Sequence, residues 1–223
     1  MSELICLGSG SSGNCYLLKH EGKTLILDAG VRWRDVGPHV TPLRDVSGCI
    51  VTHAHKDHSL AVSDMEKNGI RVFRPYDRAE QLRVQEWPPF RVTSFPVPHD
   101  GEPCVGYYIT FGDERMVYAT DFEYIRYNFH GVRPTVLLIE CNHMDDAVSD
   151  GEVKMSHVVL GHSSLSVTRD FIKANATEAL KAVILCHLSY GNADEAAMVN
   201  SICDVVGPSV DVDVAHKGFT FTF

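Results

Sequence analysis

The sequence has 223 residues, of which 44% are hydrophobic and 22% are charged. This length and apolar content supply one sizeable core, so we expect a single domain over residues 1–223. The formal net charge of −9 disfavours tight, sequence-independent binding to long DNA or RNA, because both are polyanions. A small anionic substrate is compatible with this charge, since metal cations dominate the field near them.

No apolar run is long enough to span a membrane, and the N-terminal sequence MSELICLGSG lacks the features of a secretory signal. Seven cysteines form no CxxC pair and lie mostly within apolar runs, which is typical of reduced, buried thiols. We therefore expect a cytoplasmic protein with no membrane partner.

Short runs rich in β-branched and aromatic residues recur along the chain between turn signals. They predict strands at residues 4–8, 15–19, 24–28, 48–52, 70–74, 90–97, 105–111, 115–119, 135–140, 182–187 and 218–223. Apolar residues recur at helical spacing in residues 58–68, 76–84, 164–175 and 193–206. This order predicts a β-rich α/β fold, with an early meander of strands and alternating strands and helices later.

The sequence THAHKDH, residues 52–58, follows one of the predicted buried strands. His53 and His55 lie two residues apart and would face the same side of an extended segment, so they can converge on one ion. Asp57 and His58 can then reach a second ion. A solvated polar loop is the alternative, but it gives no reason for four good metal ligands within six residues.

Three further polar residues close predicted strands farther along the chain, namely His99, Asp121 and His187. Each of them alone would fit an ordinary polar residue at a strand end. A zinc site needs at least three protein donors, so the histidine cluster requires ligands from elsewhere in the chain. We interpret these three residues as its distant partners.

Taken together, THAHKDH, His99, Asp121 and His187 resemble the ordered motifs of the metallo-β-lactamase superfamily. The resemblance implies an α/β four-layer αββα sandwich, with two divalent ions in a cleft at one edge of its two sheets. It also implies how the ions share their ligands: His53, His55 and His99 hold one ion, Asp57, His58 and His187 hold the other, and Asp121 bridges them. True β-lactamases have cysteine at the bridging position, whereas aspartate there is similar to the two-metal hydrolases. We expect zinc, with manganese or iron as alternatives, because all three suit histidine and carboxylate donors.

The opening LGSGSSGNCYLL, residues 7–18, combines glycine and serine between two predicted strands. Small residues let backbone N–H groups approach a ligand closely, although a plain glycine-rich turn explains the composition as well. The stretch resembles the N-terminal segment of the YycJ-like exonucleases and, less closely, that of tRNase Z. Both resemblances imply a phosphodiesterase.

His162 precedes a predicted helix that leads back to the strand of His187. This arrangement resembles tRNase Z, in which a histidine works with a glutamate as a proton relay, and Glu140 would be that glutamate here. Phosphodiester cleavage requires a proton for the leaving alkoxide, and a histidine oriented by a carboxylate can supply it near neutral pH. The alternative is a polar residue before a helix and a carboxylate at a strand end. We assign catalysis to His162, Glu140 and the ligand Asp57.

The sequence therefore predicts a metal-dependent phosphodiesterase, most simply a nuclease on short or single-stranded DNA. The spacing from Asp121 to His187 leaves no room for the inserted β-CASP domain or tRNA-gripping arm of larger relatives. A phosphodiesterase of small or cyclic nucleotides, similar to phage anti-Pycsar enzymes, is the first alternative. A thioesterase or lactonase is the second, and it would leave His162 unused. We expect a nucleotide or short nucleic-acid substrate and a homodimer.

Overall fold

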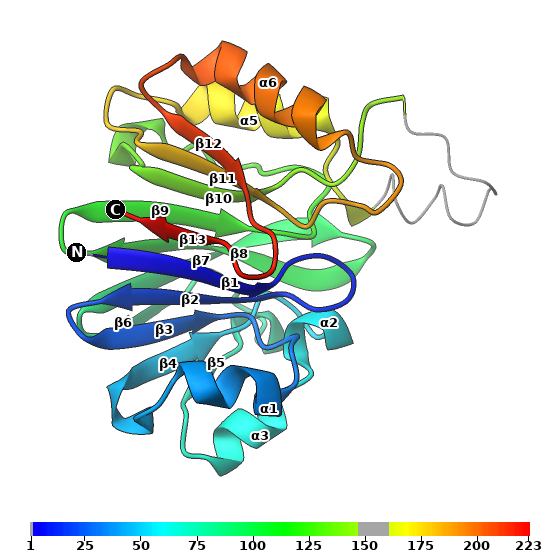
Figure 1. Ribbon diagram of the computed structural model, residues 1–223. Coiled ribbons are helices and arrows are strands. Elements are labelled where there is room, and N and C mark those ends of the chain that lie inside the picture. Colours follow the sequence, from blue (N-terminus) through cyan, green and yellow to red (C-terminus); the bar gives the residue numbers. More distant parts are fainter. Residues whose placement is uncertain (1, 147–160) are drawn as a thin grey trace.

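The computed structural model describes residues 2–146 and 161–223, and within them the strands form two sheets (Figure 1). The six-stranded sheet has the order β13-β1-β2-β3-β4-β5, and the seven-stranded sheet has the order β12-β11-β10-β9-β8-β7-β6. The strands of the first sheet are β1 (Ser2–Gly8), β2 (Cys15–His20), β3 (Lys23–Leu27), β4 (Val46–Ile50), β5 (Val72–Phe73) and β13 (Thr220–Thr222). Those of the second are β6 (Val84–Trp87), β7 (Phe90–His99), β8 (Glu102–Phe111), β9 (Glu114–Ala119), β10 (Val136–Glu140), β11 (Ala182–Cys186) and β12 (Asp211–Val214).

Helices cover the outer faces of both sheets (Figure 1). They are α1 (Trp33–Val36), α2 (Lys56–Ser59), α3 (Val62–Lys67), α5 (Leu165–Asn175) and α6 (Glu195–Val206), with short 3₁₀ helices at Gly37–His39, Leu43–Asp45, Pro75–Asp77 and His130–Val132. Helices α1 and α3 lie outside the first sheet, and α5 and α6 lie outside the second. The predicted four-layer αββα architecture is therefore confirmed. No helix in this described part of the chain has both the length and the apolar character that crossing a membrane requires.

The pairing of the strands follows the predicted change from meander to alternation. Strands β1 to β3 pair antiparallel, as do β6 to β9, whereas β9, β10, β11 and β12 pair parallel. Strand β13 pairs antiparallel with β1, so the two ends of the chain meet in the first sheet. Parallel neighbours bring the carboxyl ends of their strands to the same edge, and this property builds the site described below.

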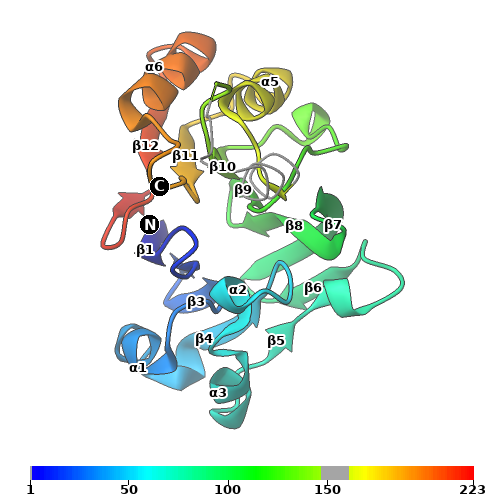
Figure 2. The same ribbon diagram turned by 90° about the vertical axis from the view of Figure 1, so that its right-hand side faces the viewer.

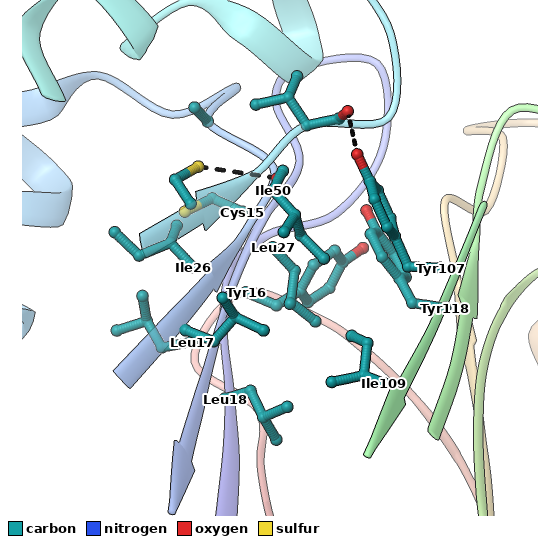
Figure 3. Packing of buried hydrophobic residues seen from close by; sticks show 14 of the residues in the cluster. Cys15, Tyr16, Leu17, Leu18, Ile26, Leu27, Ile50, Tyr107, Ile109 and Tyr118 are labelled. Carbon is teal, nitrogen blue, oxygen red and sulfur yellow. Dashed lines mark hydrogen bonds between the residues drawn. The ribbon is translucent and has the colours of Figure 1, made fainter. Parts of the chain in front are cut away.

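The apolar runs are continuous because both faces of the inner strands are buried. Tyr16 and Leu18 of β2 point across the space between the sheets toward Ile109 and Tyr118, whereas Leu17 points to the opposite face (Figure 3). The rings of Tyr16 and Tyr118 meet edge to face, with their centroids 5.8 Å apart. A second cluster of buried side chains joins the other face of the second sheet to α5 and α6.

The prediction of a helix at residues 76–84 is wrong. Only the 3₁₀ turn Pro75–Asp77 forms there, and the segment ends in the edge strand β6. Leu82, which would anchor an apolar helical face, is 53% exposed. Short helices depend on packing of that face, so helical spacing without a surface to cover does not suffice. The predicted helix at 58–68 is also divided, into α2 and α3, and strand β12 was not predicted because Asp211 and Asp213 interrupt its apolar pattern.

Gly48 offers a test of how tightly the edge of the first sheet is packed. A Cβ atom at Gly48 would lie 2.2 Å from Cζ3 of the buried Trp87 ring. We expect Gly48→Ala to lower the free energy of unfolding by about 1–3 kcal/mol, measured by urea denaturation. Gly131 is the matched control, because a Cβ there meets no heavy atom within 4 Å. Equal denaturation midpoints for the two variants would contradict this packing argument.

Candidate metal centre

The predicted ligands converge on one edge of the sandwich, where several strands end. Helix α2 marks this edge, which faces the viewer in Figure 2. His99 ends β7, His187 directly follows β11, and Asp121 lies two residues after the end of β9. His53 and His55 lie on the loop between β4 and α2, and Asp57 and His58 lie within α2. The structure thus brings all seven residues together, although Asp57 and His58 are turned inward by a helix and not by an extended segment.

The first group of donors contains His53, His55, His99 and Asp121, whose ligand atoms lie within 4.8 Å of one another. Oδ2 of Asp121 is 3.6 Å from Nε2 of His53 and 3.8 Å from Nε2 of His99. Nδ1 of His55 is 3.3 Å from Nε2 of His99. Two donors on a tetrahedral ion at about 2.1 Å are roughly 3.4 Å apart, so this spacing fits a metal ion.

The second group contains Asp57, His58, Asp121 and His187, again within 4.8 Å. Nε2 of His58 is 3.3 Å from Oδ2 of Asp121 and 3.5 Å from Oδ2 of Asp57. Nδ1 of His187 contacts Oδ1 of Asp121. Asp121 belongs to both groups, which is the position expected of a ligand that bridges two ions.

Two buried ring nitrogens lend further support to metal binding. Nε2 of His53 and Nε2 of His187 are buried without a hydrogen-bond partner among the described residues. Leaving a buried polar atom unpaired costs about 1–3 kcal/mol, and coordination to a metal would remove that cost. Burial, followed by the nearby charge of His58, lowers the pKa of His53 far below its usual range, so His53 holds the neutral form that binds metals.

The comparisons with known proteins agree with this geometry. The profile of the Metallo-beta-lactamase superfamily matches residues 8–70, which include the glycine-serine stretch and THAHKDH. YhfI from Bacillus subtilis, described as a metallo-beta-lactamase fold protein, superposes with a TM-score of 0.72 and 19% identity over 99% of this chain and 98% of YhfI. The chain has the metallo-β-lactamase fold. The short form of human tRNase Z shares this fold, with a TM-score of 0.62 and 14% identity over 99% and 98% of the two chains.

Two curated relatives are similar over nearly their whole length. Exodeoxyribonuclease WalJ of Streptococcus pneumoniae is 24% identical over 245 residues, which cover 93% of this chain and 91% of WalJ. Exodeoxyribonuclease YycJ of Bacillus anthracis is 25% identical over 243 residues, which cover 96% and 89% of the two chains. The resemblance seen in the sequence, to the metallo-β-lactamase superfamily and its YycJ-like members, is confirmed.

Three residues at this edge of the metallo-β-lactamase fold adopt the left-handed backbone conformation. They are Asp28, Asp121 and His187, with φ angles of 58°, 53° and 53°. Residues other than glycine rarely adopt this conformation, and it persists only where the surrounding structure holds it. In each case the chain has just left a strand, and the turn carries the side chain into the cluster.

Asp28 is a functional residue that the sequence analysis missed. Its fully buried carboxylate accepts hydrogen bonds from the backbone N–H of Thr52 at 2.8 Å and from Nδ1 of His58 at 2.8 Å, and a further one from the Tyr118 hydroxyl. A carboxylate on the outer nitrogen of a ligating histidine fixes its ring and tautomer. Burial opposes protonation of His58, but the carboxylates of Asp121 and Asp28 outweigh it and raise the pKa well above the usual range. The sequence did contain a signal for Asp28, because this residue ends the apolar run TLILD in the same way that Asp121 ends the apolar run RMVYATD.

The glycine-serine stretch supports the histidine loop. Asn14 donates its backbone N–H to the carbonyl of Asp57 at 2.7 Å, and its side-chain amide lies 2.9 Å from Nε2 of His58. A Cβ atom at Gly30 would lie 1.6 Å from the Asp57 carbonyl oxygen, so only glycine permits this approach. Ser9 Oγ accepts a hydrogen bond of 2.9 Å from the backbone N–H of His187. The stretch therefore contacts three members of the second group of ligands, Asp57, His58 and His187.

His162 and Glu140 form a pair beside the two groups. Nδ1 of His162 is 2.7 Å from Oε1 of Glu140, which is fully buried at the end of β10. Burial disfavours the ionised glutamate, but the adjacent His162 outweighs it and lowers the pKa of Glu140 to about 2. Burial likewise opposes the charge on His162, and Glu140 reverses the effect and raises the pKa of His162. The pair therefore holds a proton at His162 near neutral pH.

Neighbouring residues fix Glu140 in this position. Ser163 donates its backbone N–H to Oε2 of Glu140 at 3.1 Å and its hydroxyl to the Glu140 carbonyl at 3.1 Å. The next residue, Ser164, caps α5 by accepting a hydrogen bond from the backbone N–H of Val167. The donor atoms of Asp121, Glu140, His162 and His187 also lie within 4.8 Å of one another, so this corner can hold a cation as well as a proton.

Asp28→Asn tests whether the buried carboxylate controls metal binding. The amide nitrogen of asparagine would face the ring N–H of His58 and the hydroxyl of Tyr118, and it cannot accept a hydrogen bond from either. The His58 ring would then lose its fixed orientation. We expect metal affinity to fall about 10- to 100-fold, measured by competition with a chromogenic chelator. Circular dichroism would verify that the variant folds. Tyr118→Phe is the control, because it leaves the hydrogen bond between Asp28 and His58 in place, so it should lower metal affinity less. Unchanged affinity in Asp28→Asn would refute this role.

Proposed function

We propose that this chain is a phosphodiesterase that uses two divalent metal ions and cleaves short or single-stranded DNA. The observation that carries the proposal is the His162–Glu140 pair, held 2.7 Å apart beside both groups of ligands. A hydrolase of thioesters or lactones has less need of a proton donor there. The similarity to two proteins named exodeoxyribonucleases, over about nine-tenths of their length, supports DNA as the substrate.

Each residue has a proposed role in this reaction. His53, His55 and His99 would hold one ion, Asp57, His58 and His187 would hold the other, and Asp121 would contribute a donor to both. Two such ions, when bound, activate water for attack and neutralise charge that grows on the phosphoryl oxygens. The Asp57 side chain is 25% exposed, against 3% for Asp121, so Asp57 can also accept a hydrogen bond from the attacking water. His162, oriented by Glu140, gives its proton to the departing oxygen.

We propose zinc as the ion, with manganese and iron as alternatives, because the donor set suits all three. The single-domain organisation is supported by the pairing of β1 with β13, which joins both ends of the chain in one sheet. We further propose a homodimer, which light scattering of the purified protein would test.

The proton-donor role predicts that the effect of His162→Ala depends on the leaving group. An alkoxide leaving from DNA needs a proton, whereas p-nitrophenolate leaves without one. We expect DNA cleavage to fall about 10²- to 10⁴-fold and cleavage of bis-p-nitrophenyl phosphate to fall much less. The measurement is kcat for both substrates, with metal content determined on the same samples.

Metal content separates the roles of His162 in this experiment. If His162→Ala loses both activities and also loses bound metal, His162 is a metal ligand in the corner that it shares with Asp121 and His187. Glu140→Gln should imitate His162→Ala, since it removes the charge that holds the proton. Hydrolysis of thioesters or lactones that survives His162→Ala would move the chain to that class of hydrolase.

The bridging role predicts different metal stoichiometries for two aspartate variants. Asp121→Ala removes a donor from both groups, so we expect it to lose both ions on dialysis. Asp57→Ala removes a donor from the second group only, and it should retain about one ion per chain. Elemental analysis of the dialysed proteins checks this, and retention of equal metal by both variants would count against a bridge at Asp121.

The net charge of −9 favours a second candidate, a phosphodiesterase of small or cyclic nucleotides. A long polyanion is repelled at distance, whereas a mononucleotide carries little charge. Comparing kcat/KM for single-stranded DNA and for a cyclic pyrimidine nucleotide distinguishes the two candidates directly.

A further inference from the structure

A groove with a volume of about 540 Å³ lies next to the His187 end of the metal centre. Its walls are residues 9–12 of the glycine-serine stretch, residues 188–191 after β11 and residues 214–216 after β12. None of these residues belongs to the proposed ligand set. The volume lies within the range of pockets that bury small organic ligands, about 300–1,000 Å³.

The groove and the metal centre share a wall. Ser9, which lines the groove, accepts the hydrogen bond from the backbone N–H of His187. A Cβ atom at Gly10, also in the wall, would lie 3.9 Å from Cδ2 of the His187 ring. A substrate with its phosphate at the metal centre can therefore extend its neighbouring group into the groove without leaving the protein surface.

Tyr190 gives the groove its chemical character. Tyr190 is one of the residues that line the groove, and its relative exposure is 104%, compared with 53% for Leu82, the next most exposed large hydrophobic residue in the described part of the chain. An unpacked aromatic ring next to a phosphate-cleaving centre offers a face on which a base can stack. Hydroxyls of Ser11, Ser12 and Ser189 line the same groove and can bond to the edges of a base.

The far end of the groove is polar but not strongly positive. Nε2 of His216 pairs with Oε2 of Glu195 at 2.8 Å, and both residues line the groove. A carboxylate in this position disfavours a second phosphate and is compatible with an uncharged base. The arrangement therefore favours a base as the occupant of the groove.

We propose that the groove holds an unpaired nucleobase next to the scissile phosphodiester, stacked on the ring of Tyr190. This inference rests on the proposed function and adds the part of the substrate that the protein recognises. Stacking on a side chain requires a base whose face is free, so single-stranded DNA is preferred to duplex DNA. A cyclic nucleotide also carries an unpaired base. The experiment below distinguishes a base of single-stranded DNA from the base of a cyclic nucleotide.

The test compares Tyr190→Ala with Tyr190→Phe on a single-stranded oligonucleotide. Removing the ring should raise KM about tenfold with little change in kcat, and phenylalanine should restore KM because it keeps the stacking face. The effect of Tyr190→Ala should shrink to less than about twofold on an oligonucleotide whose terminal two nucleotides are abasic, because ring and base act as a coupled pair. A tenfold effect that persists on the abasic strand would overturn the stacking role.

The same assays separate this inference from the proposed function. If the metal-loaded wild-type protein cleaves no phosphodiester, the proposed function fails first. If it cleaves single-stranded DNA and Tyr190→Ala has the wild-type KM for both the DNA and the cyclic nucleotide, the function stands and the groove proposal is wrong. If Tyr190→Ala raises KM for a cyclic nucleotide only, the base belongs to a mononucleotide and the DNA source is excluded.

Discussion

The carboxylate of Asp121 is buried among histidine side chains from three separate segments, and the organisation of the site depends on it. Its Oδ2 atom lies 3.3–3.8 Å from Nε2 of His53, His58 and His99. A buried charge is tolerated only when opposite charges or metal ions compensate it. Among the described residues, Nε2 of His53 and Nε2 of the neighbouring His187 have no hydrogen-bond partner, so metal cations are a natural compensation.

Two other buried carboxylates are also paired with a histidine, but the two histidines lie in different surroundings. Asp28 accepts a hydrogen bond from His58, and Glu140 accepts one from His162. The His58 ring is fully buried, and its second nitrogen lies close to Asp57, Asp121 and Asn14, whereas the His162 side chain is 22% exposed. In the proposed function, the same carboxylate–histidine pair would orient a metal ligand in one place and hold a proton for the leaving group in the other.

The fold brings these groups together because strands from both sheets end at one edge. Continuous burial of the inner strands fixes where each strand stops, and left-handed residues at three of these ends turn the side chains inward. The loop between β1 and β2 then closes over the cluster from the first sheet, contacting His187 through Ser9 and His58 through Asn14. The same loop forms one wall of the groove at Tyr190, so the proposed metal support and the proposed substrate recognition share one segment.

The sequence by itself determined most of the strands, the fold and the types of the proposed ligands, because apolar runs that end in histidine or aspartate are local patterns. It also singled out His162 and Glu140, which the structure places 2.7 Å apart. Only the tertiary structure decided that Asp28 supports His58, that residues 76–84 form no helix, and that Tyr190 faces an open groove. These features depend on which surfaces pack together in the folded protein. The spacing of residues along the chain does not predict such contacts.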